Sequence, residues 1–403
     1  MCFVFSLKRR GGWKGLGLLL AATLPTTGAL IVDWRLLSRA ISYPKAPIMA
    51  ANWYRPRATV LGQSGTPILT SQMSPPAPLA AALDQVSVYA EQRNSTGLIV
   101  IHRGEIILEE YWQGYDAGSV FNAMSMSKTI VGLLVGVAIA EGAIDSINDP
   151  VAKYISEWAD DDRAKITLKD LLYMQSGLRN ERRTDTPFSD LVQMYVGSDV
   201  ARVALNIPPV APPGQAFDYN NVNTQILSLV LQRATKTAYP EYLSTRLWQP
   251  LAASDASVWL DRPHGTAKTF CCLFATARDW GRVGQMLLDQ GRVGPTQIIP
   301  ANWIQQMLTP SPLESTFGYH LWLKARTPDH PNVDQSANQP FLAEDTVYLD
   351  GRGLQRVYII PSQELVIVRM GELPETWDDA VIPNAMVEAL RDLRINEVRE
   401  KRE

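Results

Sequence analysis

The sequence contains few of the residues that build disulfide frameworks or structural zinc sites. Its 403 residues include only three cysteines and four histidines. These numbers exclude a disulfide framework and leave no Cys/His cluster for a structural zinc site. The adjacent Cys271 and Cys272 are expected to be two buried thiols, because a disulfide between neighbouring residues is strained. The sequence therefore indicates no metal and no cofactor.

An excess of charge of either sign is also missing. The 38 Lys and Arg residues against 41 Asp and Glu give a net charge of −3, and no basic patch stands out beyond the first 14 residues. Nucleic acid is therefore not an expected partner. The G-x-S-x-G, H-E-x-x-H and P-loop motifs are absent from the sequence, so a histidine triad, a zinc protease and a nucleotide enzyme lose support. A composition of 46% hydrophobic and 20% charged residues is globular and leaves a small-molecule enzyme, a binding protein or a scaffold.

The first 35 residues have the pattern of a membrane or export segment. Four basic residues precede an uncharged run of 18 residues, 15–32, that is rich in Leu, Ala and Gly. Crossing a bilayer takes about 17–25 such residues. No clear small-x-small site follows, so the pattern predicts an uncleaved signal-anchor in the inner membrane, with a cleaved secretory signal as the alternative. The basic flank predicts that the rest of the chain lies on the extracytoplasmic, periplasmic side.

Beyond this segment the composition of the sequence changes twice. Residues 36–78 are rich in Pro, Ser and Thr and predict a linker, or a strap lying over a domain surface. Residues 79–399 are expected to form one domain, in which a helical lobe of about 125–315 is inserted. Helical patterns begin and end this domain, and strand patterns cover residues 98–102, 105–111, 317–323, 346–349, 356–360 and 365–370. The order predicts an α/β (α+β) fold with a mostly antiparallel sheet, flanking N- and C-terminal helices and an all-helical lobe.

The pair Ser125 and Lys128 opens an apolar helical pattern that continues to about residue 141. Their i, i+3 spacing places both on one face, and Ser125 lies where free backbone N–H groups favour negative charge. The helix that follows is apolar all round, so it is expected to be buried, and burial lowers the pKa of a lysine. This arrangement predicts a serine nucleophile activated by lysine without histidine. The alternative is an N-cap serine beside a surface lysine.

A second candidate group is formed by Tyr219 and Asn221. They follow the loop Pro212-Pro213-Gly214 and precede another apolar helical pattern, 224–234. A tyrosine at the mouth of a helical lobe can relay a proton near a serine, and the asparagine can hold a lysine and a substrate carbonyl. The alternative is an aromatic anchor of the loop with an N-capping asparagine.

Taken in order, these motifs resemble the serine β-lactamase-like superfamily. The segments that carry the resemblance are 121–128, 171–178, 213–221, 248–251, 270–291 and 351–355, within about residues 80–395. The superfamily includes class C β-lactamases, penicillin-binding D-Ala-D-Ala carboxypeptidases, family VIII carboxylesterases and 6-aminohexanoate-dimer hydrolases, and the last two are closest in texture. The resemblance implies the same kind of fold as the strand and helix patterns do.

The resemblance also implies roles for single residues. Ser125 corresponds to the acylated nucleophile, Lys128 to its base and Tyr219 to the proton relay to the leaving group. Asn221 corresponds to the asparagine that orients the lysine and the substrate. The expected activity is cleavage of an ester or amide bond in a small acyl substrate. A D,D-peptidase of the penicillin-binding kind and a catalytically silent envelope binding protein remain the alternatives.

One motif of the superfamily is altered. No Lys-[Ser/Thr]-Gly follows Tyr219, and the best-placed segment places Leu349 where the family has a cation. That cation recognises a carboxylate in β-lactams and peptidoglycan stems, so its loss argues against a β-lactamase or a D,D-peptidase. Gly351 keeps the close backbone approach of a substrate, and the N–H of Arg352 is a candidate oxyanion-hole donor. Gly353 completes the expected substrate-binding segment. The sequence does not indicate an oligomeric state.

Overall fold

A computed structural model describes residues 33–63, 69–70, 74–327 and 337–400. Its main sheet has the strand order β10-β11-β12-β3-β4-β2 and is antiparallel except for the β2–β4 pair. The strands of this sheet are β2 (Leu69–Thr70), β3 (Ser95–His102), β4 (Glu105–Tyr111), β10 (Val347–Gly351), β11 (Gln355–Ile360) and β12 (Leu365–Gly371). The predicted fold class is confirmed.

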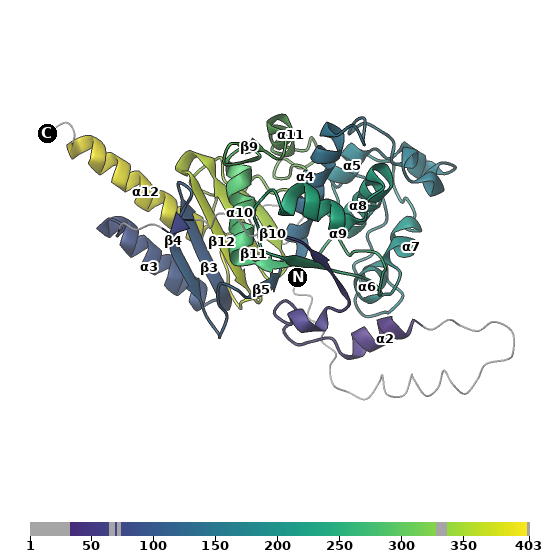
Figure 1. Cartoon of the computed structure of the whole chain (residues 1–403), viewed down its shortest axis with the longest axis horizontal. Coiled ribbons are helices and arrows are strands. Elements are labelled where there is room, and N and C mark those ends of the chain that lie inside the picture. Colours follow the sequence, from purple (N-terminus) through teal and green to yellow (C-terminus); the bar gives the residue numbers. More distant parts are fainter. Residues whose placement is uncertain (1–32, 64–68, 71–73, 328–336, 401–403) are drawn as a thin grey trace.

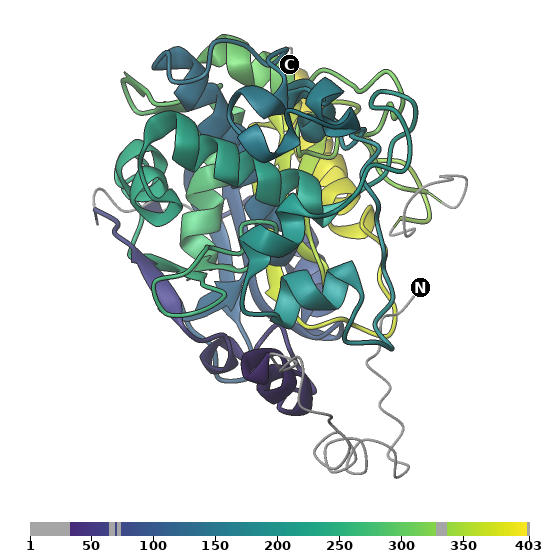
Figure 2. The same cartoon turned by 90° about the vertical axis from the view of Figure 1, so that its right-hand side faces the viewer.

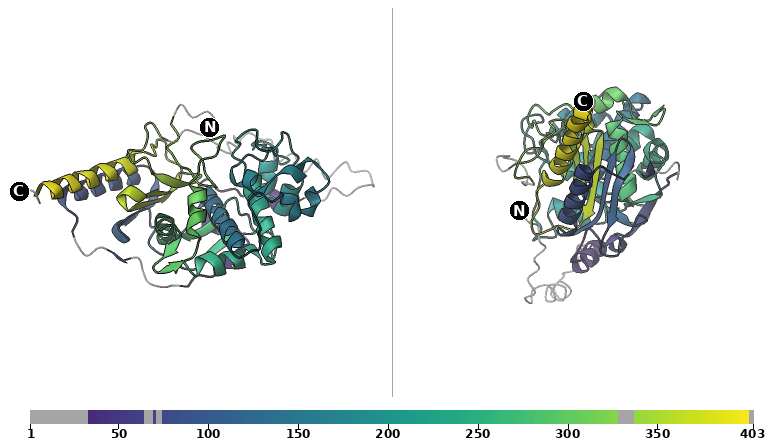
Figure 3. Two further views of the ribbon diagram at one scale, coloured as in Figure 1. Left: turned by 90° about the horizontal axis from the view of Figure 1, so that it is seen from above. Right: turned by 90° about the vertical axis from the view of Figure 1, so that its left-hand side faces the viewer.

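Helices cover both faces of this sheet, because its strands alternate between two apolar faces. On β12, Leu365 and Ile367 face the cluster under α3 (Ala77–Glu91) and α12 (Val381–Glu400), whereas Val366 and Val368 face α10 (Ala277–Leu288). Figure 1 shows α3 and α12 together at one end of the molecule, and Figure 3 shows them side by side against the sheet. The domain is therefore layered as helix, sheet and helix.

The rest of the chain forms a helical lobe with a second, smaller sheet (Figure 2). Its longest buried element is α4 (Ser127–Ala140), whose residues from Ser127 to Ala138 are all buried. The other helices of this part are α5 (Leu168–Leu172), α6 (Asp190–Val196), α7 (Val200–Leu205), α8 (Asn221–Thr235), α9 (Tyr239–Leu243) and α11 (Ala301–Met307). The second sheet has the order β1-β6-β7-β5, with β1 (Arg57–Val60), β5 (Val120–Asn122), β6 (Ala256–Trp259) and β7 (Leu273–Thr276). A hairpin of β8 (Arg292–Val293) and β9 (Thr296–Gln297) follows α10.

Two details differ from the sequence prediction. The lobe predicted to be all-helical contains β6 and β7, which are short and find their partners in distant segments. Residues 317–323, predicted as a strand, form only isolated bridges at Phe317 and Trp322. His320 is left-handed there, with φ 56°, and its ring nitrogens bond the Leu172 carbonyl and the Thr224 hydroxyl. These contacts turn the segment down onto the helical lobe.

The N-terminal arm, residues 33–60, is folded onto the domain. Helix α2 (Trp34–Ile41) lies beside α6, and the Arg39 guanidinium donates to the carbonyls of Val196, Gly197 and Asp261. Further along the arm, two backbone N–H groups donate to the Glu372 carboxylate at 2.8 and 2.9 Å, and β1 pairs with β6. The arm thus contains a helix and a strand that its Pro-rich texture did not indicate.

The predicted signal-anchor falls almost entirely outside the described residues. Residues 1–32 are not described, so the structure does not test that prediction. Among the helices from residue 33 onward that the structure describes, none is long and apolar enough to span a bilayer.

A buried ion pair ties α12 to the main sheet. Arg356 on β11 donates through Nε and Nη2 to the two carboxylate oxygens of Asp379, at 2.8 and 2.9 Å, and both side chains are fully buried. Tyr358 and Trp377 donate to the same carboxylate at 2.8 and 2.6 Å. A buried charge that loses its partner is costly, because water cannot replace that partner.

We therefore expect Asp379→Ala to lower the free energy of unfolding by about 3–5 kcal/mol, the usual cost of breaking a buried pair. Urea unfolding followed by circular dichroism measures this change. Asp392→Ala, which removes an exposed carboxylate from α12, is the matched control and should change stability by less than about 0.5 kcal/mol. Equal losses in both variants would contradict the prediction.

Candidate active site

Ser125 lies at the junction between β5 and α4. A 3₁₀ turn, Met124–Met126, joins these two elements, and Met124 adopts the left-handed conformation with φ 49°. The Asn122 side chain stabilises this kink by accepting a hydrogen bond from the Met124 N–H at 3.0 Å. Both methionines are buried whereas Ser125 stays partly exposed. The turn therefore presents the Ser125 hydroxyl at the N-terminal end of a buried helix.

Lys128 lies beneath this hydroxyl. Its Nζ is 2.7 Å from Ser125 Oγ and 2.7 Å from the carbonyl oxygen of Phe270, and only 1% of the residue is exposed. Burial lowers the pKa of Lys128 to about 7, although the Asp350 carboxylate acts in the opposite direction. Near neutral pH a large fraction of this lysine is therefore the free amine, which can accept the Ser125 proton.

Tyr219 completes the group from the loop before α8. Its ring stacks on Trp322 with 5.8 Å between centroids, and Lys128 Nζ lies 5.1 Å from the centroid of the tyrosine ring. Burial, together with the Asp350 carboxylate, raises the pKa of the Tyr219 phenol well above its usual value, although the Ser125 side chain lowers it. The phenol is thus protonated where the lysine is largely neutral, which separates an acid from a base.

Asn221 has a different environment from the one that the sequence suggested. It is the first residue of α8 and is half-buried, and no hydrogen bond to Lys128 is found among the described residues. Asn220 caps the helix instead, accepting from the Val222 N–H. The second partner of the lysine is the Phe270 carbonyl, which sequence reasoning missed, because a backbone oxygen has no side-chain signature. A catalytic role of Asn221 remains a prediction.

The end of β10 lies directly against the Ser125 turn. A Cβ on Gly351 would overlap the Ala123 carbonyl oxygen, so only glycine permits this approach of the two backbones. Arg352 is exposed at the following turn. Gly353 has φ 79° and packs against Ile48 of the N-terminal arm. The predicted substrate segment is therefore adjacent to the nucleophile.

The two residues before Gly351 face opposite sides of the sheet. Leu349 is fully buried in the apolar core that also contains Met126. Asp350 accepts hydrogen bonds from Arg326 at 2.6 Å and from Arg356. The sequence analysis did not identify Asp350 as part of the site, although its charge acts on both Lys128 and Tyr219. The sequence could have indicated Asp350, because this residue lies within the altered third motif.

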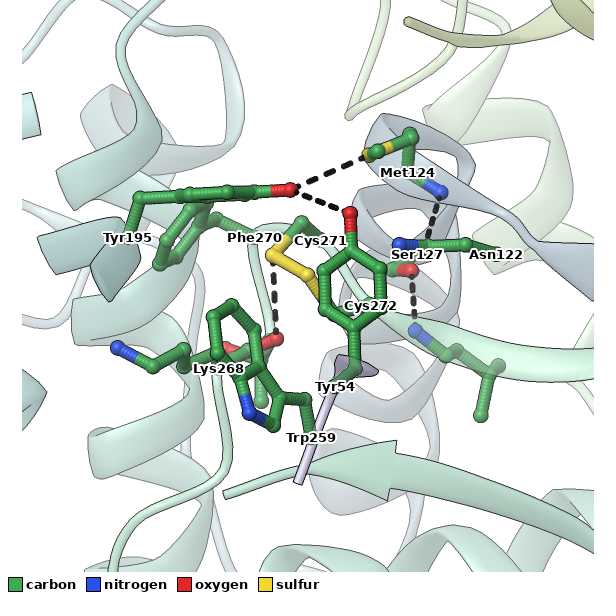
Figure 4. The surroundings of a disulfide bond; sticks show 12 residues. Tyr54, Asn122, Met124, Ser127, Tyr195, Trp259, Lys268, Phe270, Cys271 and Cys272 are labelled. Atoms are coloured by element: carbon green, nitrogen blue, oxygen red, sulfur yellow. Dashed lines mark hydrogen bonds between the residues drawn. A yellow bond between two sulfur atoms is a disulfide. The ribbon is translucent and has the colours of Figure 1, made fainter. Parts of the chain in front are cut away.

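The prediction for the adjacent cysteines is wrong. Cys271 and Cys272 are joined by a disulfide, and both are buried (Figure 4). Cys272 is left-handed, with φ 72°, and this turn of the backbone lets neighbouring side chains meet. The disulfide directly follows Phe270, whose carbonyl accepts from Lys128.

Comparisons with known proteins show which family the chain belongs to. The chain is 26% identical to the 6-aminohexanoate-dimer hydrolase of Paenarthrobacter ureafaciens over 312 residues, which are 74% of this chain and 77% of the relative. A Bacillus anthracis structure named as a 6-aminohexanoate-dimer hydrolase superposes with a TM-score of 0.68 at 21% identity, covering 86% of this chain and 93% of that one. A family VIII carboxylesterase superposes with a TM-score of 0.60 at 17% identity, over 80% and 98% of the two chains. The Beta-lactamase family model matches residues 79–391, and the chain therefore belongs to this family, within the serine β-lactamase-like superfamily.

Proposed function

We propose that the protein is a serine hydrolase that cleaves an amide or ester bond of a small acyl substrate through an acyl-enzyme on Ser125. The observation that carries this proposal is the buried Lys128, whose Nζ is 2.7 Å from Ser125 Oγ and whose pKa is lowered to about 7. A buried lysine is costly to retain unless its free amine is used. The resemblance in sequence to a 6-aminohexanoate-dimer hydrolase gives independent support.

In the first half of the reaction, the Lys128 amine takes the Ser125 proton while Oγ attacks the substrate carbonyl carbon. The tetrahedral intermediate collapses as the Tyr219 phenol donates its proton to the departing amine or alcohol. Lys128 returns its extra proton to the tyrosine. We assign the backbone N–H groups of Ser125 and Arg352 as the donors to the oxyanion, since β10 lies against the serine turn there.

In the second half, water attacks the acyl carbonyl and gives one proton to the Tyr219 oxygen, while the phenol passes its own proton to the Lys128 amine. Collapse of this intermediate releases the carboxylic acid and returns the proton to Ser125 Oγ, so the enzyme ends as it began. Asn221 is proposed to contact the substrate rather than the lysine, because it is half-buried at the start of α8.

The substrate class follows from the altered third motif. Leu349, which stands in place of the family's cation, is buried in the core and offers a substrate carboxylate no charge. This favours small amides and esters over β-lactams and peptidoglycan stem peptides. We further propose that the N-terminal segment anchors the enzyme in the membrane with its catalytic domain on the extracytoplasmic side, on the basis of the charge pattern of residues 1–35.

Replacement of the nucleophile tests the central assignment. Ser125→Ala should lower kcat for p-nitrophenyl butyrate by about 10³-fold or more, as loss of a nucleophile does in serine hydrolases. Steady-state rates of p-nitrophenol release by the full chain measure this change. The control Ser119→Ala removes a hydroxyl from the loop before β5 and should keep wild-type kinetics. Full activity in Ser125→Ala would overturn the proposal, and a silent wild type would favour a binding function.

The pH dependence tests the base. Only the neutral amine of Lys128 can accept a proton, so kcat/KM should fall about tenfold for each pH unit below the lysine pKa, which is about 7. Above that pH the profile should level off until Tyr219 loses its proton. Initial rates measured from about pH 5 to about pH 9 define this acid limb, the part of the profile in which kcat/KM falls with decreasing pH. A flat profile across pH 7 would exclude Lys128 as the titrating base.

Replacement of Asp350 tests which charges set the acid limb of the kcat/KM profile. Its carboxylate raises the pKa of Lys128, so Asp350→Asn should lower that pKa and move the acid limb to lower pH. The kcat/KM profile measured on folded variant protein, checked by circular dichroism, gives this shift. Movement of the limb to higher pH would contradict the assigned electrostatics.

A further inference from the structure

The segment that contains the disulfide forms three hydrogen bonds with residues 123–128, the turn that carries Ser125. The Phe270 carbonyl accepts from Lys128 Nζ at 2.7 Å. Three residues further on, the Leu273 N–H donates to Ser127 Oγ at 3.2 Å, and the Leu273 carbonyl accepts from the Ala123 N–H at 3.0 Å. Four residues, 270–273, therefore lie along the whole turn that carries Ser125.

The disulfide ring lies between these anchors. Cys271 and Cys272 occupy the two positions that separate the Phe270 carbonyl from the Leu273 amide, and they are 4% and 0% exposed. The Cys272 carbonyl accepts from the Trp259 N–H at 3.1 Å, which fixes the ring to β6. Figure 4 shows the ring beside Phe270, Ser127 and Trp259. The ring therefore links the contact at the Phe270 carbonyl to the contact at the Leu273 amide.

The backbone inside the ring is unusual for a residue with a side chain. Cys272 has φ 72°, a conformation that glycine adopts freely and other residues rarely adopt. The covalent bond to Cys271 closes a small ring that removes most of the alternative backbone conformations. The ring therefore maintains a turn that an unlinked cysteine would tend to leave.

The contact with the Phe270 carbonyl matters for a neutral lysine. A free amine has one lone pair, and this lone pair must point at the Ser125 hydroxyl to take its proton. Donation of one N–H to the Phe270 carbonyl fixes the rotation of the amine about its Cε–Nζ bond. Without that acceptor the lone pair would sample other directions, and the base would be misaligned for most of the time.

We infer that the Cys271–Cys272 disulfide is a positioning element for the base: by holding the backbone turn after Phe270, it keeps the carbonyl that orients the Lys128 amine toward Ser125. This inference rests on the proposed serine hydrolase function. No hydrogen bond joins either cysteine to Ser125, Lys128 or Tyr219 among the described residues, so the pair is proposed to act through the Phe270 carbonyl.

Two substitutions at one position separate the ring from the backbone turn. Cys272→Ala breaks the ring and keeps a Cβ in the left-handed conformation, whereas Cys272→Gly breaks the ring and accepts that conformation freely. In Cys272→Ala we expect kcat for p-nitrophenyl butyrate to fall about tenfold or more, as part of the 10²–10⁴-fold that a positioned base contributes. KM should stay within about twofold, because the base does not bind the ground state. Cys272→Gly should recover most of the lost kcat.

The bond itself is checked by alkylating the unfolded wild-type chain without reductant and mapping its peptides. Unmodified Cys271 and Cys272 support the inference, and alkylation of both overturns it. A wild-type kcat in Cys272→Ala also overturns the inference. Equal changes of kcat, KM and thermal stability in Cys272→Ala and Cys272→Gly overturn it as well, because they indicate a purely structural role.

The failure of this inference differs from that of the proposed function. Turnover that depends on Ser125 but is unchanged in the cysteine variants removes only the positioning role. Absence of Ser125-dependent turnover in the wild type removes both.

Discussion

The site depends on one buried amine held between two oxygens. In the proposed mechanism, Lys128 is neutral at physiological pH because α4 withdraws it from water, and it is aligned on Ser125 because the Phe270 carbonyl accepts another of its hydrogen bonds. These two requirements come from different parts of the chain: α4 follows β5, whereas Phe270 precedes β7. The second sheet, in which β5 pairs with β7, brings them together.

Much of the fold and the central pair could be predicted from local patterns. The strands β3, β4, β11 and β12 are long enough for their runs of strand-forming residues to be visible, and the apolar length of α4 revealed that its first-turn lysine would be buried. The order of motifs added Tyr219, which the structure places against Lys128. Patterns of this kind succeed where a side chain carries the information.

The rest could not be predicted because the information lies in backbone atoms or in distant partners. The Phe270 carbonyl has no residue type of its own, and the four residues of β6 become a strand only by pairing with β1 and β7. His320 turns a strand-like sequence because its ring finds two buried partners on other elements. The disulfide was missed because a general rule about neighbouring cysteines does not foresee a left-handed residue inside the pair.

The N-terminal arm changes where the folding unit begins. The family match starts at residue 79, yet β1 of the arm covers the outer edge of β6, and Tyr54 packs on Trp259 with 5.0 Å between ring centroids. A fragment trimmed to the matched region would leave the backbone of that edge strand open and an indole uncovered. Such an edge is a template for association with other chains. Homology boundaries would thus cut this protein inside its own hydrophobic core, and the useful boundary is the start of α2.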